Sequence, residues 1–195
     1  MPLLNQGDVI GFTIDALERM QIPYMVCGSI AAGSLGRPRM TLDIDIVIQI
    51  GSSKVDELCA AFPNPEFYVS AAAARDAISH GKQFNVIHPT SGNKVDFMIL
   101  GRDEWARTQL QRRCRIQLVP GVLGYSASAE DIIVSKMKYH QEGGSEKHIN
   151  DSAHILAVQG DRIDRAYIEH WVKEFGLTEI WNAIIQRVAA NSREP

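Results

Sequence analysis

Hydrophobic and polar positions predict alternating helices and strands over the first two thirds of the chain. A first helix is expected over residues 7–23, because Ile10, Ile14 and Leu17 fall on one stripe, with Asp8 as its N-cap and Pro23 as its end. Strands are predicted at 24–27, 41–50, 66–70, 82–89, 93–100 and 114–120, and further helices at 29–36, 51–61, 71–80 and 103–113. Ser70 and Gly81 would cap the helix between them, and the turn-rich TSGN makes a hairpin of the strands on either side of it.

The last third of the chain has a purely helical pattern. Helices are predicted within 126–144, 145–160, 161–176 and 177–190, and Ser128 with Asp131 forms a capping-box pattern for the first. The expected fold is therefore a mixed α/β (α+β) sheet flanked by helices. We expect a core domain over residues 1–120 and a helical lobe over 121–195, packed on that core.

The clearest strand, TLDIDIVIQI, contains two aspartates. Its apolar residues fall on both sides of the pleat, which predicts a central strand covered by helices. Asp43 and Asp45 share one face, roughly 7 Å apart along the strand. Two such carboxylates repel each other, and a divalent cation relieves that repulsion. Their hard oxygen atoms favour Mg²⁺ or Mn²⁺. The alternative is a pair of strand-end aspartates in water or paired with Arg37 and Arg39.

Composition limits the classes of protein to consider. With 195 residues, 45% hydrophobic and 22% charged, the chain is typical of a folded globular protein. A formal net charge of -3 argues against a protein that coats nucleic acid. No apolar run approaches the roughly 18 residues of a membrane helix, and the first residues do not resemble a secretory signal. The cysteines number 3 and lie far apart, which suggests reduced thiols and a cytoplasmic location.

Two further features strengthen the case for a site at the aspartates. Gly28 and Ser29 end one strand and open a short helix, whose free backbone N–H groups can hold phosphate. Asp96 is a lone carboxylate in another apolar strand and would make a third acid. A simple turn at Gly28 and an ion pair of Asp96 with Lys94 are the alternative interpretations.

These residues together resemble the DNA polymerase beta-like nucleotidyltransferase superfamily over about residues 24–100. Arg39-Met40-Thr41 before the aspartates looks like the minimal prokaryotic members, including abortive-infection toxins. The resemblance implies that Asp43, Asp45 and Asp96 bind two Mg²⁺ (or Mn²⁺) ions. It also implies that a nucleoside triphosphate contacts Gly28, Ser29, Arg39 and Thr41, and that Asp96 lies beside the acceptor.

The helical tail gives a second match to that group. Glu130, Asp131 and Lys136 follow one pattern of the group, and Lys147 with Asp151 follows another, whereas His148 stands where an acid is common. Lys136 would neutralise phosphate charge; an exposed lysine on a helix is the alternative.

Nucleotidyl transfer is the predicted activity: a nucleoside monophosphate moves to an acceptor that the sequence does not identify. RNA, protein and small molecules are candidates. A cluster of five arginines is best interpreted as a solvated helix face, and contact with an RNA acceptor is the alternative. These arginines are Arg102, Arg107, Arg112, Arg113 and Arg115. A non-catalytic module that binds a nucleotide or a partner protein is the competing function, and a phosphohydrolase is a third.

Overall fold

The computed structural model describes residues 4–191, which divide into two compact units. The first contains the chain up to Ile30 and then Met40–Ala127; the second contains Ala31–Arg39 and the chain from Ser128 onward. Helix α2 (Gly28–Leu35) begins in the first unit and continues in the second. Of the helices described, none combines the length and the apolar character needed to cross a membrane.

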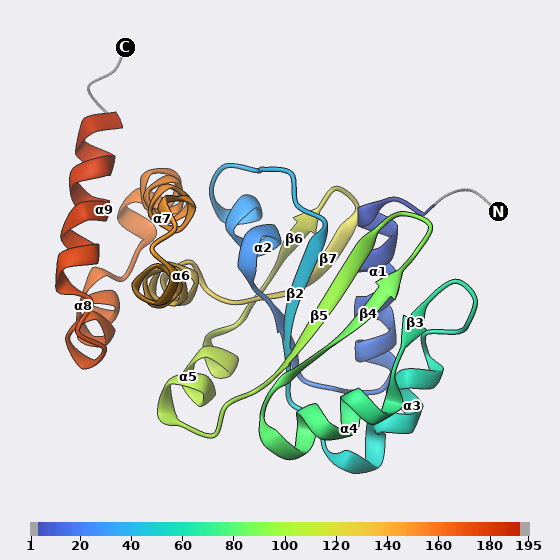
Figure 1. Ribbon diagram of the computed structural model, residues 1–195. Helices are drawn as coiled ribbons and strands as arrows, with labels where there is room; N and C mark the ends of the chain where they lie inside the picture. The colour runs from blue at the N-terminus through green and yellow to red at the C-terminus, as the bar shows by residue number, and fades with distance from the viewer. Residues whose placement is uncertain (1–3, 192–195) are drawn as a thin grey trace. The chain divides into compact units, whose positions relative to one another are not determined.

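One mixed sheet of seven strands lies entirely within the first unit (Figure 1). Its order is β3-β4-β5-β2-β1-β7-β6. The strands are β1 (Tyr24–Val26), β2 (Asp43–Ile48), β3 (Tyr68–Val69), β4 (Gln83–His88), β5 (Asn93–Ile99), β6 (Cys114–Val119) and β7 (Val122–Ser126). The pairs β2–β5 and β1–β7 are parallel, and the other neighbours are antiparallel. The hairpin predicted around TSGN is confirmed as β4–β5.

Strand β2 is central, but it is not covered on both faces as the sequence suggested. Ile44, Ile46 and Ile48 are fully buried, whereas Asp43 is exposed and Asp45 and Val47 are only half-buried. The strand in fact alternates, and Val47 is the apolar residue that obscures the alternation. The open face of β2 therefore gives its carboxylates access to water.

Helices of the first unit lie close to the predicted positions, but the first helix ends at Arg19 and not at Pro23, and its N-cap differs. They are α1 (Gln6–Arg19), the 3₁₀ turn η1 (Ser52–Lys54), α3 (Val55–Ala60), α4 (Ala71–His80) and α5 (Glu104–Arg112). Asn5, not Asp8, caps α1: the Asn5 side chain accepts from the Asp8 backbone N–H, and the Asp8 carboxylate accepts in return from the Asn5 N–H. Ser70 and Gly81 cap α4 as predicted.

The buried face of the sheet is covered through an aromatic cluster. Phe12 of α1 stacks on Phe67, with ring centroids 5.0 Å apart, and meets the edge of Phe62. Phe62 in turn contacts Phe97 of β5, with centroids 6.0 Å apart. Phe97 is fully buried, so this cluster holds the inner side of β5 in place.

Strand β7 was not predicted, and it moves the end of the sheet past the expected boundary at residue 120. Gly124 weakens the strand pattern, but its small size lets neighbouring side chains pack against the strand. A Cβ atom there would lie 2.7 Å from the side chains of both Ile14 and Leu118. The longer segment of the helical unit accordingly begins at Ser128, after β7 has ended.

Among the described residues, four α-helices and one 3₁₀ turn follow β7. They are α6 (Ala129–Gly143), α7 (Glu146–Gln159), η2 (Gly160–Arg162), α8 (Arg165–Glu174) and α9 (Thr178–Asn191). Asp131 is fully buried and is held by Ser128 Oγ at 2.8 Å and Tyr167 Oη at 2.6 Å. Glu130 accepts from the Asp164 backbone N–H at 3.1 Å. The acidic pair in the tail motif thus joins the starts of α6 and α8.

We expect Tyr167→Phe to lower the free energy of unfolding by about 1–3 kcal/mol, because the buried Asp131 carboxylate loses a hydrogen-bond donor. Denaturant unfolding followed by circular dichroism measures the change. Tyr139→Phe is the matched control, since the Tyr139 side chain is 48% exposed and a smaller change is expected. Equal effects of the two substitutions would show that the Tyr167 hydrogen bond does not stabilise the fold.

Candidate active site

Three carboxylates lie on the open face of the sheet. In the parallel β2–β5 pair, Asp45 is directly opposite Asp96, and Asp43 is directly opposite Lys94. Partners in register point to the same side, as do residues two apart in one strand, so all four side chains share one face. Asp96 is mostly buried, with its side chain 12% exposed, whereas Asp43 is 56% exposed. The sheet register therefore places together the acids that the sequence selected.

An ammonium group lies between two of these acids. Lys94 Nζ is 2.9 Å from Asp96 Oδ2 and 3.4 Å from Asp43 Oδ1. The hydrogen bond to Asp96 raises the pKa of Lys94 above its usual value, so the ammonium stays charged. The ion pair of Asp96 with Lys94, the alternative raised by the sequence, is present. It coexists with the three-acid arrangement.

Gly28 is in direct contact with the third carboxylate. Its φ is +60°, in the left-handed region that favours glycine. A Cβ atom at this position would lie 1.8 Å from Asp45 Oδ2. The Cys27 backbone N–H also donates to the Asp45 carbonyl at 2.9 Å. The start of α2 and the acid of β2 are thus fitted closely together, and only glycine allows this approach.

The other residues expected at a nucleotide are engaged within the protein. Thr41 Oγ1 is 3.3 Å from the Asp43 backbone N–H, so this hydroxyl shapes the start of β2. In the second unit, Lys136 Nζ donates to Asp151 Oδ2 at 2.7 Å, and Arg39 Nε lies 3.5 Å from the same oxygen. Lys136 is buried, 4% exposed, so it is not the exposed lysine of the alternative interpretation. Asp151 therefore holds both cations.

His148, the departure in the tail motif, lies in the same helix as Asp151. Burial lowers the pKa of His148, and the charges of Lys136 and Lys147 act in the same direction. Lys136 pairs with Asp151 of the same helix as His148.

Asn85 is a neighbour of the acids that the sequence analysis did not identify. It is exposed and lies directly opposite Asp96 in the antiparallel β4–β5 pair. Counting outward from the hairpin turn would have found it, because the pair His88–Asn93 fixes the register of both strands.

The donor set fits a divalent cation in its chemistry. The three acids supply hard oxygen atoms on one face, and the Lys94 ammonium already lies where positive charge is favoured. Within residues 4–191, however, no group of three or more His, Cys, Asp or Glu side chains is arranged as a ready metal site. Asp43 and Asp96 contact Lys94, so a metal ion would require these side chains to rearrange.

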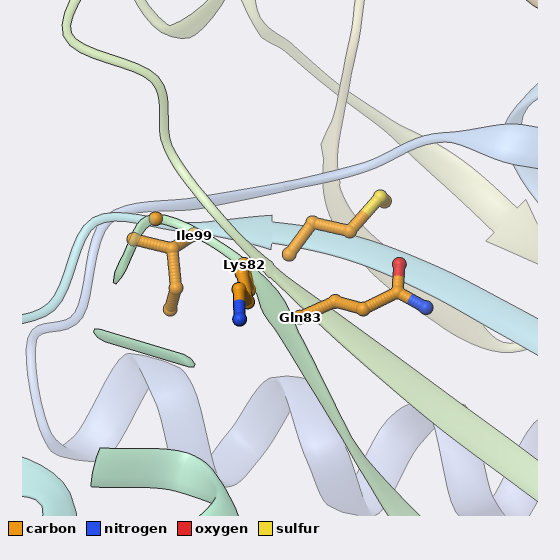
Figure 2. Close-up of a pocket in the computed structure, with 5 residues that line it drawn as sticks. Lys82, Gln83 and Ile99 are labelled. Atoms are coloured by element: carbon orange, nitrogen blue, oxygen red, sulfur yellow. The ribbon is translucent and has the colours of Figure 1, made fainter. Parts of the chain in front are cut away.

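An open pocket lies where β4 begins and β5 ends. Its volume is about 460 Å³, and it is lined by Gly81, Lys82, Gln83, Met98 and Ile99 (Figure 2). Met98 follows Asp96 by two residues and so points to the same face of the sheet. The pocket contains none of the three acids, and we do not assign the chemistry to it.

Comparison with known proteins identifies the fold. No family model matches the sequence, and no curated protein matches it significantly. Among solved structures, ANT(2'')-Ia in complex with adenylyl-2''-tobramycin matches with a TM-score of 0.61 and 17% identity, covering 87% of this chain and 98% of that one. The chain has the nucleotidyltransferase fold.

Two further solved structures agree with this assignment. The lincosamide antibiotic adenylyltransferase LnuA, bound to lincomycin, has a TM-score of 0.53 and 10% identity, covering 80% of this chain and 98% of that one. An antigenic nucleotidyltransferase-like protein from Paracoccidioides brasiliensis has a TM-score of 0.53 and 20% identity, covering 90% of this chain and 91% of that one.

We expect Gly28→Ala to destabilise the protein more than Gly81→Ala does. Both glycines have a left-handed φ, +60° and +63°, but a Cβ at Gly81 meets nothing within 4 Å. Both variants incur the left-handed strain of about 1–2 kcal/mol. Only Gly28→Ala adds the collision with Asp45, for about 1–3 kcal/mol more. Denaturant unfolding of both variants measures the difference, and equal losses would mean that Asp45 moves aside freely.

Proposed function

We propose that this protein is a metal-dependent nucleotidyltransferase that transfers a nucleoside monophosphate from a nucleoside triphosphate to a hydroxyl acceptor. The observation that carries the proposal is the set of three carboxylates on the open face, with Gly28 against Asp45. The nucleotidyltransferase fold supports it, because the acids occupy strands of the fold's own sheet. A module that only binds a nucleotide would not need three acids.

Each residue has a distinct role in this proposal. Asp43, Asp45 and Asp96 would hold divalent cations, and Gly28 and Ser29 would bind the triphosphate through backbone N–H groups at the start of α2. Asp96 would accept the proton of the acceptor hydroxyl. The acceptor oxygen then forms a bond to the α-phosphorus as the bond to the bridging oxygen breaks, and pyrophosphate leaves. Bound Mg²⁺ or Mn²⁺ would supply stabilisation of charge on the entering and leaving oxygens.

Three of the proposed nucleotide contacts are less direct. Lys136 and Arg39 would reach a nucleotide only by sharing or leaving Asp151, which contacts both. Thr41 would act by fixing the Asp43 backbone at the start of β2. We therefore assign Arg39, Thr41 and Lys136 to nucleotide binding only as supporting residues.

Hydroxylated small molecules are the acceptors to test first. The structures of ANT(2'')-Ia and LnuA, which this chain matches over 98% of their lengths, contain adenylyl-2''-tobramycin and lincomycin. RNA and protein are the second group of candidate acceptors. The arginines of α5 and β6 are the surface to examine if RNA proves to be the acceptor.

The test is incubation with each nucleoside triphosphate, Mg²⁺ and panels of aminoglycosides, lincosamides, transfer RNA and protein, followed by mass spectrometry. We expect one acceptor to gain the mass of a nucleoside monophosphate and release pyrophosphate, and Asp45→Asn to abolish this. Calorimetry should show that Asp45→Asn also loses binding of the Mn²⁺–nucleotide complex. Nucleotide binding without transfer would favour the non-catalytic module, and phosphate release without an acceptor would favour a phosphohydrolase.

We expect Asp96→Asn to retain most nucleotide binding but to lose about a hundredfold or more in transfer rate, the scale of losing a positioned proton acceptor. Single-turnover kinetics measures the transfer step and calorimetry the binding. Asp56→Asn is the control, because Asp56 is an exposed acid of the same unit that pairs with Arg75. A parallel loss of binding and transfer in Asp96→Asn would contradict its role in the chemical step.

A further inference from the structure

Lys94 is a basic residue placed inside the acid cluster by the sheet itself. It lies on β5, directly opposite Asp43 and two residues before Asp96. Its ammonium contacts Asp96 at 2.9 Å and Asp43 at 3.4 Å, one contact from each strand. The ammonium thus bridges two acids that the proposed function assigns to metal binding. A divalent cation held by Asp43 and Asp96 would compete with the ammonium for their carboxylate oxygen atoms.

The Lys94 ammonium and a divalent cation would exclude each other at the carboxylates of Asp43 and Asp96. Without metal, the ammonium offsets repulsion between the carboxylates, which is strong at short range in a partly buried site. A divalent cation neutralises the acids and repels the ammonium, so the two cations do not share the oxygens favourably. Lys94 is 35% exposed, which leaves its flexible side chain room to move. A triphosphate bound at the same face would offer it a new anionic partner.

We propose that Lys94 is an internal counter-ion that occupies the metal position of the acid cluster until metal and nucleotide bind together. The inference rests on the proposed function for the identity of the acids as metal ligands. It makes Lys94 a positioning residue that acts through Asp43 and Asp96. Metal alone binds weakly, because it must displace the ammonium. Metal with nucleotide binds tightly, because the phosphates hold the displaced ammonium.

This arrangement predicts a positive coupling between metal and nucleotide that depends on Lys94. By thermodynamic linkage, each ligand strengthens binding of the other by the same factor. Removing the ammonium should raise the affinity for metal alone and reduce the coupling. A lysine that only contacted phosphate would behave differently: its loss would weaken nucleotide binding and leave the affinity for metal alone unchanged.

The experiment measures Mn²⁺ binding by electron paramagnetic resonance to the wild type, Lys94→Met, Lys94→Arg and Lys82→Met. Each is titrated alone and with a non-hydrolysable nucleoside triphosphate. Lys82→Met removes the same charge from an exposed residue at the far end of β4, and Lys94→Arg keeps the charge. We expect Lys94→Met to bind Mn²⁺ alone about tenfold or more tightly than the wild type does. This is the scale on which a contacting ammonium stabilises the charged form of a carboxylate, and the metal no longer has to displace it. Lys82→Met and Lys94→Arg should resemble the wild type.

Thermal unfolding separates this role from a purely structural one. Lys94→Met should melt below the wild type in chelator, because the acids then repel each other, and saturating Mn²⁺ should erase the difference. A lower melting temperature that Mn²⁺ does not restore, or unchanged affinity for Mn²⁺ alone, would overturn the inference. If the wild type with nucleotide binds no Mn²⁺, the proposed metal site itself fails. If it binds Mn²⁺ and Lys94→Met is no tighter, only the role of Lys94 fails.

Discussion

The parallel pairing of β2 with β5 is the constraint on which the candidate site depends. Asp45 and Asp96 come from strands separated by about fifty residues of sequence, and only this register places them side by side. A slip of one residue would turn one set of acids into the aromatic core beneath the sheet. The buried isoleucines of β2 and Phe97 of β5 prevent such a slip, because they fix which face of each strand is inward. The residues buried on the inner face of β2 and β5 therefore determine that the three acids lie together on the opposite face.

The acidic residues of the two units illustrate different uses of the same side chain. Asp131 is fully buried and hydrogen-bonded to hydroxyl groups, so it stabilises the helical unit. Asp43 and Asp96 share one ammonium, that of Lys94, on an open face. Asp151 is intermediate, since it is paired with a buried lysine and a half-exposed arginine. The groups that each aspartate contacts, and its exposure to water, distinguish a structural aspartate from a candidate site aspartate better than sequence motifs do.

The sequence was sufficient to predict the fold class, most elements and the acids that gather on the sheet. It succeeded where local signals are strong, as at Ser70 and Gly81 around α4. It failed at β7, where Gly124 is typical of a loop although in the structure Ile14 packs closely against it. It also mistook the half-open β2 for a fully covered strand. Both errors concern neighbours far away in the chain, which a local pattern does not contain.

The position of Lys94 shows the same limit within the site. Its proximity to Asp96 was visible in the sequence, but its contact with Asp43 depends on the β2–β5 register. Asn85 likewise becomes a neighbour of Asp96 only through the hairpin register. The sequence identifies residues by type, whereas long-range pairing decides which of them interact.

The interleaved division of the chain has a consequence for modularity. The helical unit is built from two separate segments, and Gln159 of α7 donates to the Leu35 carbonyl at 2.6 Å, joining them. A cut at any single peptide bond therefore cannot release it whole. Gene recombination at one junction before Ser128 would separate residues 31–39 from the helices that they pack against. Gly36 would then lose Ile155, which it approaches closely. The two units are thus expected to be inherited together, and an exchanged lobe would have to bring its own version of this short segment.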